Sequence, residues 1–174
     1  NPDTVLEEAT RRVMSPKMLC AFKDGTKTMV EMTAMSNYTG LIPDVIGGHG
    51  PKTAPGTEGV KELNDIFKLK EDGGILNKHG VVEYVNGIAP GVFVTVSTPN
   101  EEIAYQMGYH SMGPGPLWTL YRPFHLCNLE TPLTVAKAVI DGEVTCVPID
   151  GLVSECITRA KIDLKAGQTI DGIG

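Results

Sequence analysis

The irregular order of helical and strand-like segments is the feature that most limits the fold of this sequence. Apolar residues recur at the spacing of an amphipathic helix in residues 3–14, 24–38, 60–67, 99–108 and 131–140. Runs rich in apolar or β-branched residues predict strands at residues 18–22, 81–85, 91–97 and 117–121. Because strands and helices do not alternate regularly, the sequence favours an α+β fold, with a mixed or antiparallel sheet that carries helices on one face.

Glycine and proline residues mark the expected ends of these segments. Pro16 is expected to end the first helix, and Gly40 is expected to end the second. In the last helix, Thr131 is the expected cap and Pro132 lies in the first turn, while Gly142 follows the end. A change in sequence character near residues 148–151 indicates a domain boundary, which gives expected domains at residues 1–150 and 151–174.

Charge and composition exclude several classes of partner. The 174 residues are 41% hydrophobic and 21% charged, which indicates a globular chain with a core. The net charge of −6 makes the chain a poor partner for nucleic acid or anionic lipid. No apolar run approaches the roughly 20 residues that span a bilayer. From the charge and the short apolar runs, we expect no nucleic-acid or membrane partner. The cysteines lack the spacing of zinc or redox pairs, so we expect them to be buried free thiols in a reducing cytoplasm.

The sequence FKDGTKTMVEM, residues 22–32, holds the strongest candidates for catalytic chemistry. Helical spacing places Asp24, Lys27 and Glu31 on one side of a helix that is otherwise unusually apolar, with Lys23 just outside it. Such a helix is expected to be buried, and buried charges are rare unless they are paired or used. A lysine between carboxylates can hold a proton for a developing alkoxide, and the carboxylates can orient it or hold a metal ion. The alternative is a structural ion pair.

A second group of candidates lies in TLYRPFHL. Tyr121, Arg122 and His125 suit the binding of a phosphate or carboxylate, because arginine binds such groups with two hydrogen bonds and histidine titrates near neutral pH. The alternative is a surface arginine with a histidine in the core. The glycines of MGPGP, residues 112–116, could present amides to an anion, but the pattern favours a tight turn.

The glycine- and proline-rich residues 43–59 predict a long loop around His49. Loops of this length inside a compact domain usually carry function or move. Small residues on both sides of His49 would let a ligand approach closely, which makes it a candidate for substrate binding. The alternative is a flexible loop with an incidental histidine.

Several motifs together resemble one family of oxidoreductases. They follow one another as FKDGTKTMVEM, KEDGGIL, VNGIAPGVFV, MGPGP, TLYRPFHL, LETPLTVAKAVIDGE and DLKAGQTIDGIG. In combination they are similar to the homoserine-dehydrogenase-like oxidoreductases with a C-terminal SAF domain, a group that includes deoxyxylulose-phosphate-reductoisomerase-like enzymes. The resemblance covers essentially the whole chain.

The resemblance implies that cofactor binding and catalysis are carried out by different domains. It implies a Rossmann domain that binds NADP or NAD, and no GxGxxG motif is present in this chain to supply it. Because residues 1–3 lead straight into a helical pattern without a starting methionine, we expect the cofactor domain before Asn1. Residues 1–150 are then a catalytic, substrate-binding and dimerisation domain, and residues 151–174 begin a β-rich SAF-like module.

The expected function is hydride transfer between a nicotinamide and the carbonyl of a small polar substrate, phosphorylated or not. Lys27 would protonate or stabilise the alkoxide, with Asp24 and Glu31 orienting it, and Arg122 with His125 or His49 would hold an anionic group. A reductoisomerase would also recruit a divalent metal through Asp24 and Glu31. The expected partners are a small-molecule substrate and a second copy of the chain. The alternatives are a non-catalytic binding module and a dimerisation domain.

Overall fold

The structure is a computed structural model, and it describes residues 2–124, 127–149, 151–160 and 162–170. The chain divides into two compact units. The first contains Asn1–Ile42 and Cys146–Gly174, and the second contains Pro43–Thr145. One of the two crossings between the units, between Thr145 and Cys146, lies close to the expected boundary at residues 148–151, and the structure groups the residues after it with Asn1–Ile42.

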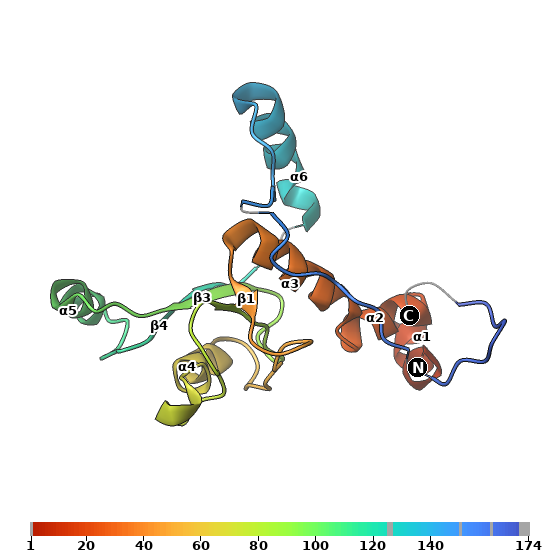
Figure 1. Cartoon of the computed structure of the whole chain (residues 1–174), viewed down its shortest axis with the longest axis horizontal. Coiled ribbons are helices and arrows are strands. Elements are labelled where there is room, and N and C mark those ends of the chain that lie inside the picture. Colours follow the sequence, from red (N-terminus) through yellow and green to blue (C-terminus); the bar gives the residue numbers. More distant parts are fainter. Residues whose placement is uncertain (1, 125–126, 150, 161, 171–174) are drawn as a thin grey trace. The chain divides into compact units, whose positions relative to one another are not determined.

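The first unit begins with short helices that are packed on one another (Figure 1). They are η1 (Pro2–Val5), α1 (Leu6–Arg11), α2 (Pro16–Lys23) and α3 (Thr26–Thr39). The prediction of a strand at residues 18–22 is wrong, because α2 occupies them. Pro16 starts this helix rather than only ending the previous one, since proline needs no hydrogen-bond partner at a first helical position. Leu19, Cys20 and Ala21 of the apolar run are buried in this helix.

The C-terminal end of α3 holds the last part of the chain through Asn37. Gly40 ends α3 in the left-handed conformation with φ of 76°, which confirms the prediction for this residue. The Asn37 side-chain oxygen accepts hydrogen bonds from the backbone amides of Val153 at 2.7 Å and Ser154 at 3.0 Å. The Asn37 amide donates to the Ser154 carbonyl at 3.1 Å. The residues that the structure describes from 151 to 170 contain no strand.

The second unit combines two small sheets with helices, so the predicted α+β class is confirmed (Figure 1). β1 (Ile42–Pro43), at the junction of the two units, pairs with β2 (Val81–Val82). β3 (Val92–Val96) runs antiparallel to β4 (Trp118–Arg122), with Val92 opposite Arg122 and Val96 opposite Trp118. The helical elements are α4 (Thr57–Ile66), η2 (Lys70–Asp72), α5 (Glu101–Tyr109), α6 (Cys127–Ala136) and η3 (Lys137–Asp141).

The core of the second unit forms where α4 meets the segments that follow it. Leu63 and Phe67 lie four positions apart and therefore on one side of α4, where they pack with Leu76 and Ile88. Phe67 also stacks on Phe93 of β3, with ring centroids 5.5 Å apart. This packing fixes the opposite side of α4 as a solvent-facing surface.

Local capping signals locate α5 well and α6 poorly. The Asn100 side chain accepts hydrogen bonds from the amides of Glu102 and Ile103, as expected for a helix cap. α6 begins at Cys127 and not at Thr131, so Pro132 lies inside the helix and removes one of its backbone hydrogen bonds. Gly142 ends the helical segment with φ of 68°, as predicted.

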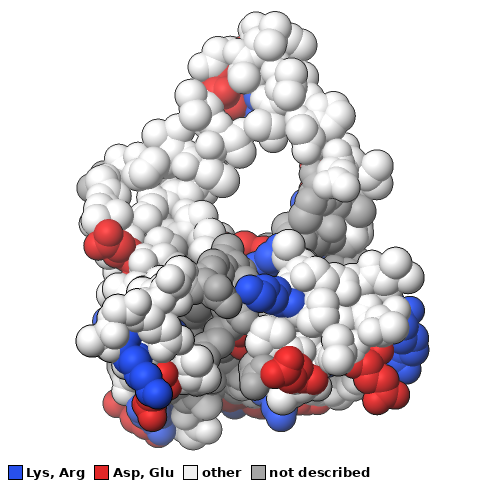
Figure 2. All heavy atoms as spheres, turned by 90° about the vertical axis from the view of Figure 1, so that its right-hand side faces the viewer, with Lys and Arg blue, Asp and Glu red and all other residues white. Residues whose placement is uncertain are grey.

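The segment formed by α6 and η3 presents many apolar side chains to solvent. The large exposed ones are Leu129, Leu133, Val135, Val139 and Ile140. Figure 2 shows few charged side chains over this segment, which is at the top of the view. None of the helices that the structure describes is long and apolar enough to cross a membrane. Cys20 is buried as predicted, whereas Cys146 and Cys156 are exposed.

Candidate functional site

Asp24 shapes the turn that connects α2 to α3. Its Oδ1 accepts hydrogen bonds from the Thr26 amide at 3.0 Å and the Thr26 hydroxyl at 2.6 Å. The Cys20 thiol lies 3.6 Å from the second carboxylate oxygen, within reach of a weak sulfur hydrogen bond. Gly25 follows in the left-handed conformation, with φ of 82°. The carboxylate therefore stabilises the first turn of α3, where the helix dipole favours a negative charge.

Lys23 is paired with an acid from outside the predicted group. Its ammonium forms an ion pair with the Glu8 carboxylate of α1. The hydrogen bond from Lys23 lowers the pKa of Glu8, against a smaller opposing effect of burial. This pair links α1 to the end of α2, which gives Lys23 a structural role next to the candidate residues.

Lys27 lies in the first turn of α3, and its ammonium contacts an aromatic ring. The Lys27 Nζ lies 4.3 Å from the centroid of the Phe22 ring, within the range of a cation–π interaction. Among the described residues, no carboxylate lies within ion-pair distance of this ammonium. The ring holds the ammonium in place without neutralising its charge, so the ammonium can still attract a negatively charged atom of a ligand.

The prediction that α3 is a buried helix is wrong. Only Ser36 is buried along α3, whereas Asp24 and Glu31 are exposed and Lys27 is partly buried. Within its unit, α3 packs on α2. Eight of its fourteen residues are Thr, Ser, Asn, Lys or Glu, so the helix has no apolar surface around its whole circumference that would require burial. Lys27 and Glu31 form no ion pair in the part of the chain that the structure describes, so the alternative of a structural pair is not seen either.

A buried cluster of one histidine and two carboxylates lies in the second unit, around His49. Glu83 Oε1 accepts hydrogen bonds from the His49 backbone amide and from His49 Nδ1, both at 2.9 Å. On the other side of the ring, His49 Nε2 lies 3.5 Å from Asp44 Oδ2. The side chains of His49, Glu83 and Asp44 are 18%, 4% and 0% exposed. We call these three residues the His49 cluster.

Asn77 and the glycines of the loop complete the surroundings of the His49 cluster. Asp44 Oδ2 accepts hydrogen bonds from the backbone and side-chain amides of Asn77, at 2.9 and 3.0 Å. Asp44 Oδ1 has no hydrogen-bond partner in the described part of the chain. A side chain at Gly50 would collide with the Tyr84 ring, and φ is 53° there, so glycine is required at this position. Hydrogen bonds to Glu83 and close packing on Tyr84 therefore support the loop around His49 in this conformation.

Asp44 and Glu83 were missed from the sequence, although Glu83 leaves a signal. It is the only charged residue in the apolar run VVEYV, where a charge is unusual unless it has a buried partner. Two carboxylates beside His49 repel an anion, so this geometry does not favour His49 as the group that holds an anionic substrate. No cluster of metal-ligating side chains that could hold an ion occurs among the described residues.

The second predicted group, in TLYRPFHL, uses its hydrogen bonds within the chain. The Tyr121 hydroxyl donates to the Ile88 carbonyl at 2.9 Å. Arg122 pairs with Glu130 of α6, and its guanidinium lies 4.4 Å from the centroid of the Phe124 ring. His125 lies outside the described residues. Tyr121 and Arg122 thus stabilise the second unit, and a substrate anion would have to displace Glu130 from Arg122.

The matched protein family spans both units. Residues 1–131 of the 174 match the model of a family described as "Oxidoreductase DRL, catalytic domain". The match includes the turn at Asp24, the ammonium of Lys27 and the whole His49 cluster. A comparison with curated proteins finds no match. The prediction of an oxidoreductase family is confirmed at this level, and the chain belongs to the family of oxidoreductase DRL catalytic domains.

Proposed function

We propose that the chain is the catalytic part of an NADP- or NAD-dependent oxidoreductase that acts on the hydroxy or keto group of a small polar substrate, phosphorylated or not. The observation that supports this most directly is the family match, which covers the FKDGTKTMVEM segment completely. The resemblance to homoserine-dehydrogenase-like and reductoisomerase-like enzymes supports the choice of a carbon–oxygen bond as the reacting group.

The residues present in this chain do not fit the phosphates of a dinucleotide. The glycine-rich strand–turn–helix that binds such phosphates carries the pattern GxGxxG, and this pattern is absent from the sequence. A nicotinamide cofactor would therefore be held mainly by residues outside this chain. A divalent metal at Asp24 and Glu31 is not supported, because the Asp24 carboxylate already stabilises the first turn of α3 and the described residues contain no metal-ligating cluster.

Lys27 is the residue that we assign to proton transfer. When a carbonyl is reduced, negative charge develops on its oxygen, and an ammonium at hydrogen-bond distance can give that oxygen a proton. Phe22 holds the ammonium, and Asp24 fixes the turn that places Lys27 at the start of α3. Since Lys27 is only partly buried, its amine can recover a proton from solvent after each turnover.

The proposal is tested by a redox assay on the intact enzyme that contains this chain. NADPH and NADH are each mixed with a panel of small keto acids, aldehydes and their phosphorylated forms, and nicotinamide absorbance is followed. We expect oxidation of the cofactor that depends on one carbonyl compound and on enzyme concentration. If neither cofactor is consumed with any member of a broad panel, the assignment to carbonyl reduction is contradicted.

Assembly into a homo-oligomer is a second candidate function, which the exposed apolar side chains of α6 and η3 favour. A second copy could cover these side chains by a symmetric contact. We expect sedimentation velocity to show a dimer or larger species, and Leu133→Asp to shift it to the monomer. Thr134→Asp, which adds the same charge at the next exposed residue, is the control. A monomeric wild-type chain at micromolar concentration contradicts this candidate.

A further inference from the structure

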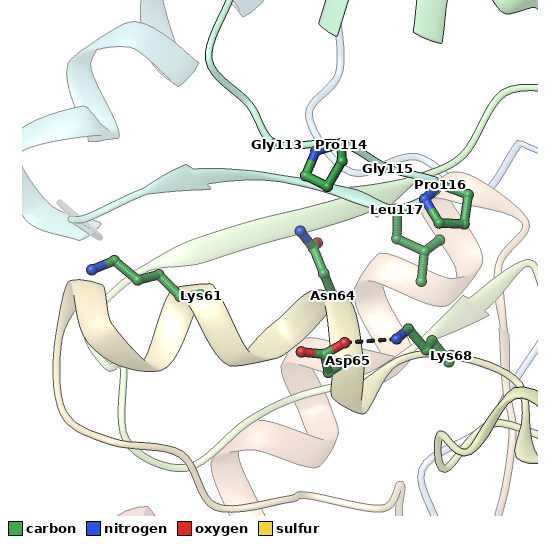
Figure 3. Close-up of a pocket in the computed structure, with 9 residues that line it drawn as sticks. All are labelled: Lys61, Asn64, Asp65, Lys68, Gly113, Pro114, Gly115, Pro116 and Leu117. Carbon is green, nitrogen blue, oxygen red and sulfur yellow. Dashed lines mark hydrogen bonds and ion pairs between the residues drawn. The ribbon is translucent and has the colours of Figure 1, made fainter. Parts of the chain in front are cut away.

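A cavity lies between α4 and the loop of residues 113–117, entirely within the second unit (Figure 3). Its volume is about 210 Å³, and the residues that line it in α4 or just after its end are Lys61, Asn64, Asp65 and Lys68. Asn64 lies at the edge of the core-facing side of α4, where its side chain reaches Thr119 of β4. The cavity is smaller than the roughly 300–1,000 Å³ typical of sites for drug-sized molecules, so it suits a small ligand.

Asn64 is oriented by the Thr119 hydroxyl, which in turn pairs with the hydroxyl of Thr95. The Thr119 hydroxyl donates to Asn64 Oδ1 at 2.8 Å. The oxygens of Thr95 and Thr119 are also 2.8 Å apart, and because the single proton of Thr119 is used on Asn64, Thr95 must be the donor in that pair. The Asn64 oxygen is therefore satisfied, and its NH2 group has no acceptor among the described residues. Figure 3 shows Asn64 directed from α4 toward Gly113 and Pro114.

Lys68 supplies a positive charge that a ligand can recruit. Its ammonium lies 2.6 Å from Asp65, and the two side chains are 34% and 80% exposed. An exposed ion pair of this kind contributes only about 0–1 kcal/mol, so an anion bound in the cavity can compete with Asp65. Lys68 also lines a neighbouring cavity of about 410 Å³, which leaves room for the remainder of a ligand.

The loop opposite α4 is rigid and carries unused backbone donors. Trp118 donates from its ring nitrogen to the Gly113 carbonyl at 3.2 Å. A side chain at Gly115 would collide with the Trp118 ring, so this glycine allows the loop to pack tightly on a buried residue. In the described part of the chain, the amides of Gly113 and Gly115 make no hydrogen bond. The tight turn predicted from MGPGP therefore also forms a wall of the cavity.

We propose that this cavity binds a small ligand through its carboxylate or phosphate group. Asn64 gives a directed hydrogen bond and Lys68 gives the charge, which is the combination that distinguishes an oxyanion from a neutral molecule. Asp65 opposes binding, because it competes for Lys68. The proposal does not depend on the proposed redox function, since every residue that carries it lies in the second unit and Lys27 lies in the first.

The test is a titration of the full chain with inorganic phosphate and, separately, with acetate, at constant ionic strength. NMR follows the side-chain amide of Asn64, and the shift is fitted for a dissociation constant. Saturation at a lower concentration of phosphate than of acetate indicates a phosphate site. The reverse order indicates a carboxylate site. We expect a saturable shift that involves Asn64 and the amides of Gly113 and Gly115.

Three variants are expected to weaken binding, to strengthen it and to leave the dissociation constant nearly unchanged. Asn64→Asp keeps the acceptor for Thr119 but replaces the NH2 donor by a negative oxygen, so binding should weaken about tenfold or more. Its affinity is read from the Gly113 and Gly115 amides. Asp65→Asn frees Lys68, so binding should strengthen about twofold to fivefold. Lys52→Ala removes an exposed lysine that does not line either cavity, and it should change the constant by less than about twofold.

Two results would overturn the proposal. One is a shift that rises linearly with probe concentration, without saturation, in the wild-type chain. The other is an equal loss of binding in Asn64→Asp and Lys52→Ala, which would mean that net charge and not the cavity attracts the anion.

Discussion

Replacing Glu83 by alanine should lower the free energy of unfolding of the second unit by about 1–3 kcal/mol, the usual cost of leaving a buried hydrogen-bond donor without its acceptor. Glu83 accepts hydrogen bonds from both the backbone and the ring of His49, and its side chain is almost completely buried. Without it, the His49 amide and ring lose their acceptor while remaining inside the protein. Asp44 is then left as the only carboxylate beside the ring.

The single tryptophan of the chain gives a direct measurement of this effect. Trp118 is 2% exposed and belongs to the same unit as Glu83, so its fluorescence during urea unfolding reports on that unit. Glu71→Ala removes the same type of side chain from an exposed position in this unit and is the matched control. A Glu83→Ala midpoint that equals the Glu71→Ala midpoint would show that the His49 cluster does not stabilise the fold.

Replacing Lys27 by methionine should lower kcat/KM of the intact enzyme about a hundredfold, which corresponds to about 3 kcal/mol of transition-state stabilisation. Methionine has a similar length and can still contact the Phe22 ring, but it has neither charge nor proton. Lys27→Arg keeps the charge, although guanidinium gives up a proton poorly, so it should recover part of the activity only. The rates come from the nicotinamide absorbance assay, and circular dichroism confirms that the variants are folded.

The control and the ratio of the kinetic constants separate chemistry from binding. Lys52→Met makes the same change at an exposed lysine in the second unit and should leave turnover unaltered. A proton donor acts in the transition state, so kcat should fall while KM changes little. If Lys27→Met raises KM at constant kcat, Lys27 binds substrate and donates no proton. If it changes neither, Lys27 has no part in the reaction.

Local signals in the sequence predicted the local structure well. Gly40 and Gly142 end helices as expected, because a glycine in the left-handed conformation closes a helix regardless of its surroundings. Asn100 caps α5 for a similarly local reason. Residues 18–22 were assigned to a strand because a short apolar run has no clear period, and Pro16 at the first helical position decides the structure instead.

Contacts between distant residues could not be predicted. His49 and Glu83 are 34 positions apart, and Asn64 and Thr119 are 55 positions apart, so no spacing rule connects either pair. Burial of α3 was expected from its methionine, valine and alanine residues, but eight of its fourteen residues are Thr, Ser, Asn, Lys or Glu, and only Ser36 is buried there. The sequence therefore identified His49 and Lys27 as candidates without the partners that define what each can do.

The hydrogen bonds of Asn37 affect the order in which the two units can be completed during synthesis. Asn37 reaches its partners Val153 and Ser154 across 116 and 117 positions, because the second unit is inserted between the two segments of the first. On the ribosome, the helices of the first unit emerge before the second unit but must wait for residues that are synthesised after it. The inserted unit is one continuous stretch and has all of its residues sooner. Completion of the two units therefore runs opposite to the order in which they begin to be synthesised, and nascent α1–α3 still lacks its partners when the second unit already has all of its residues.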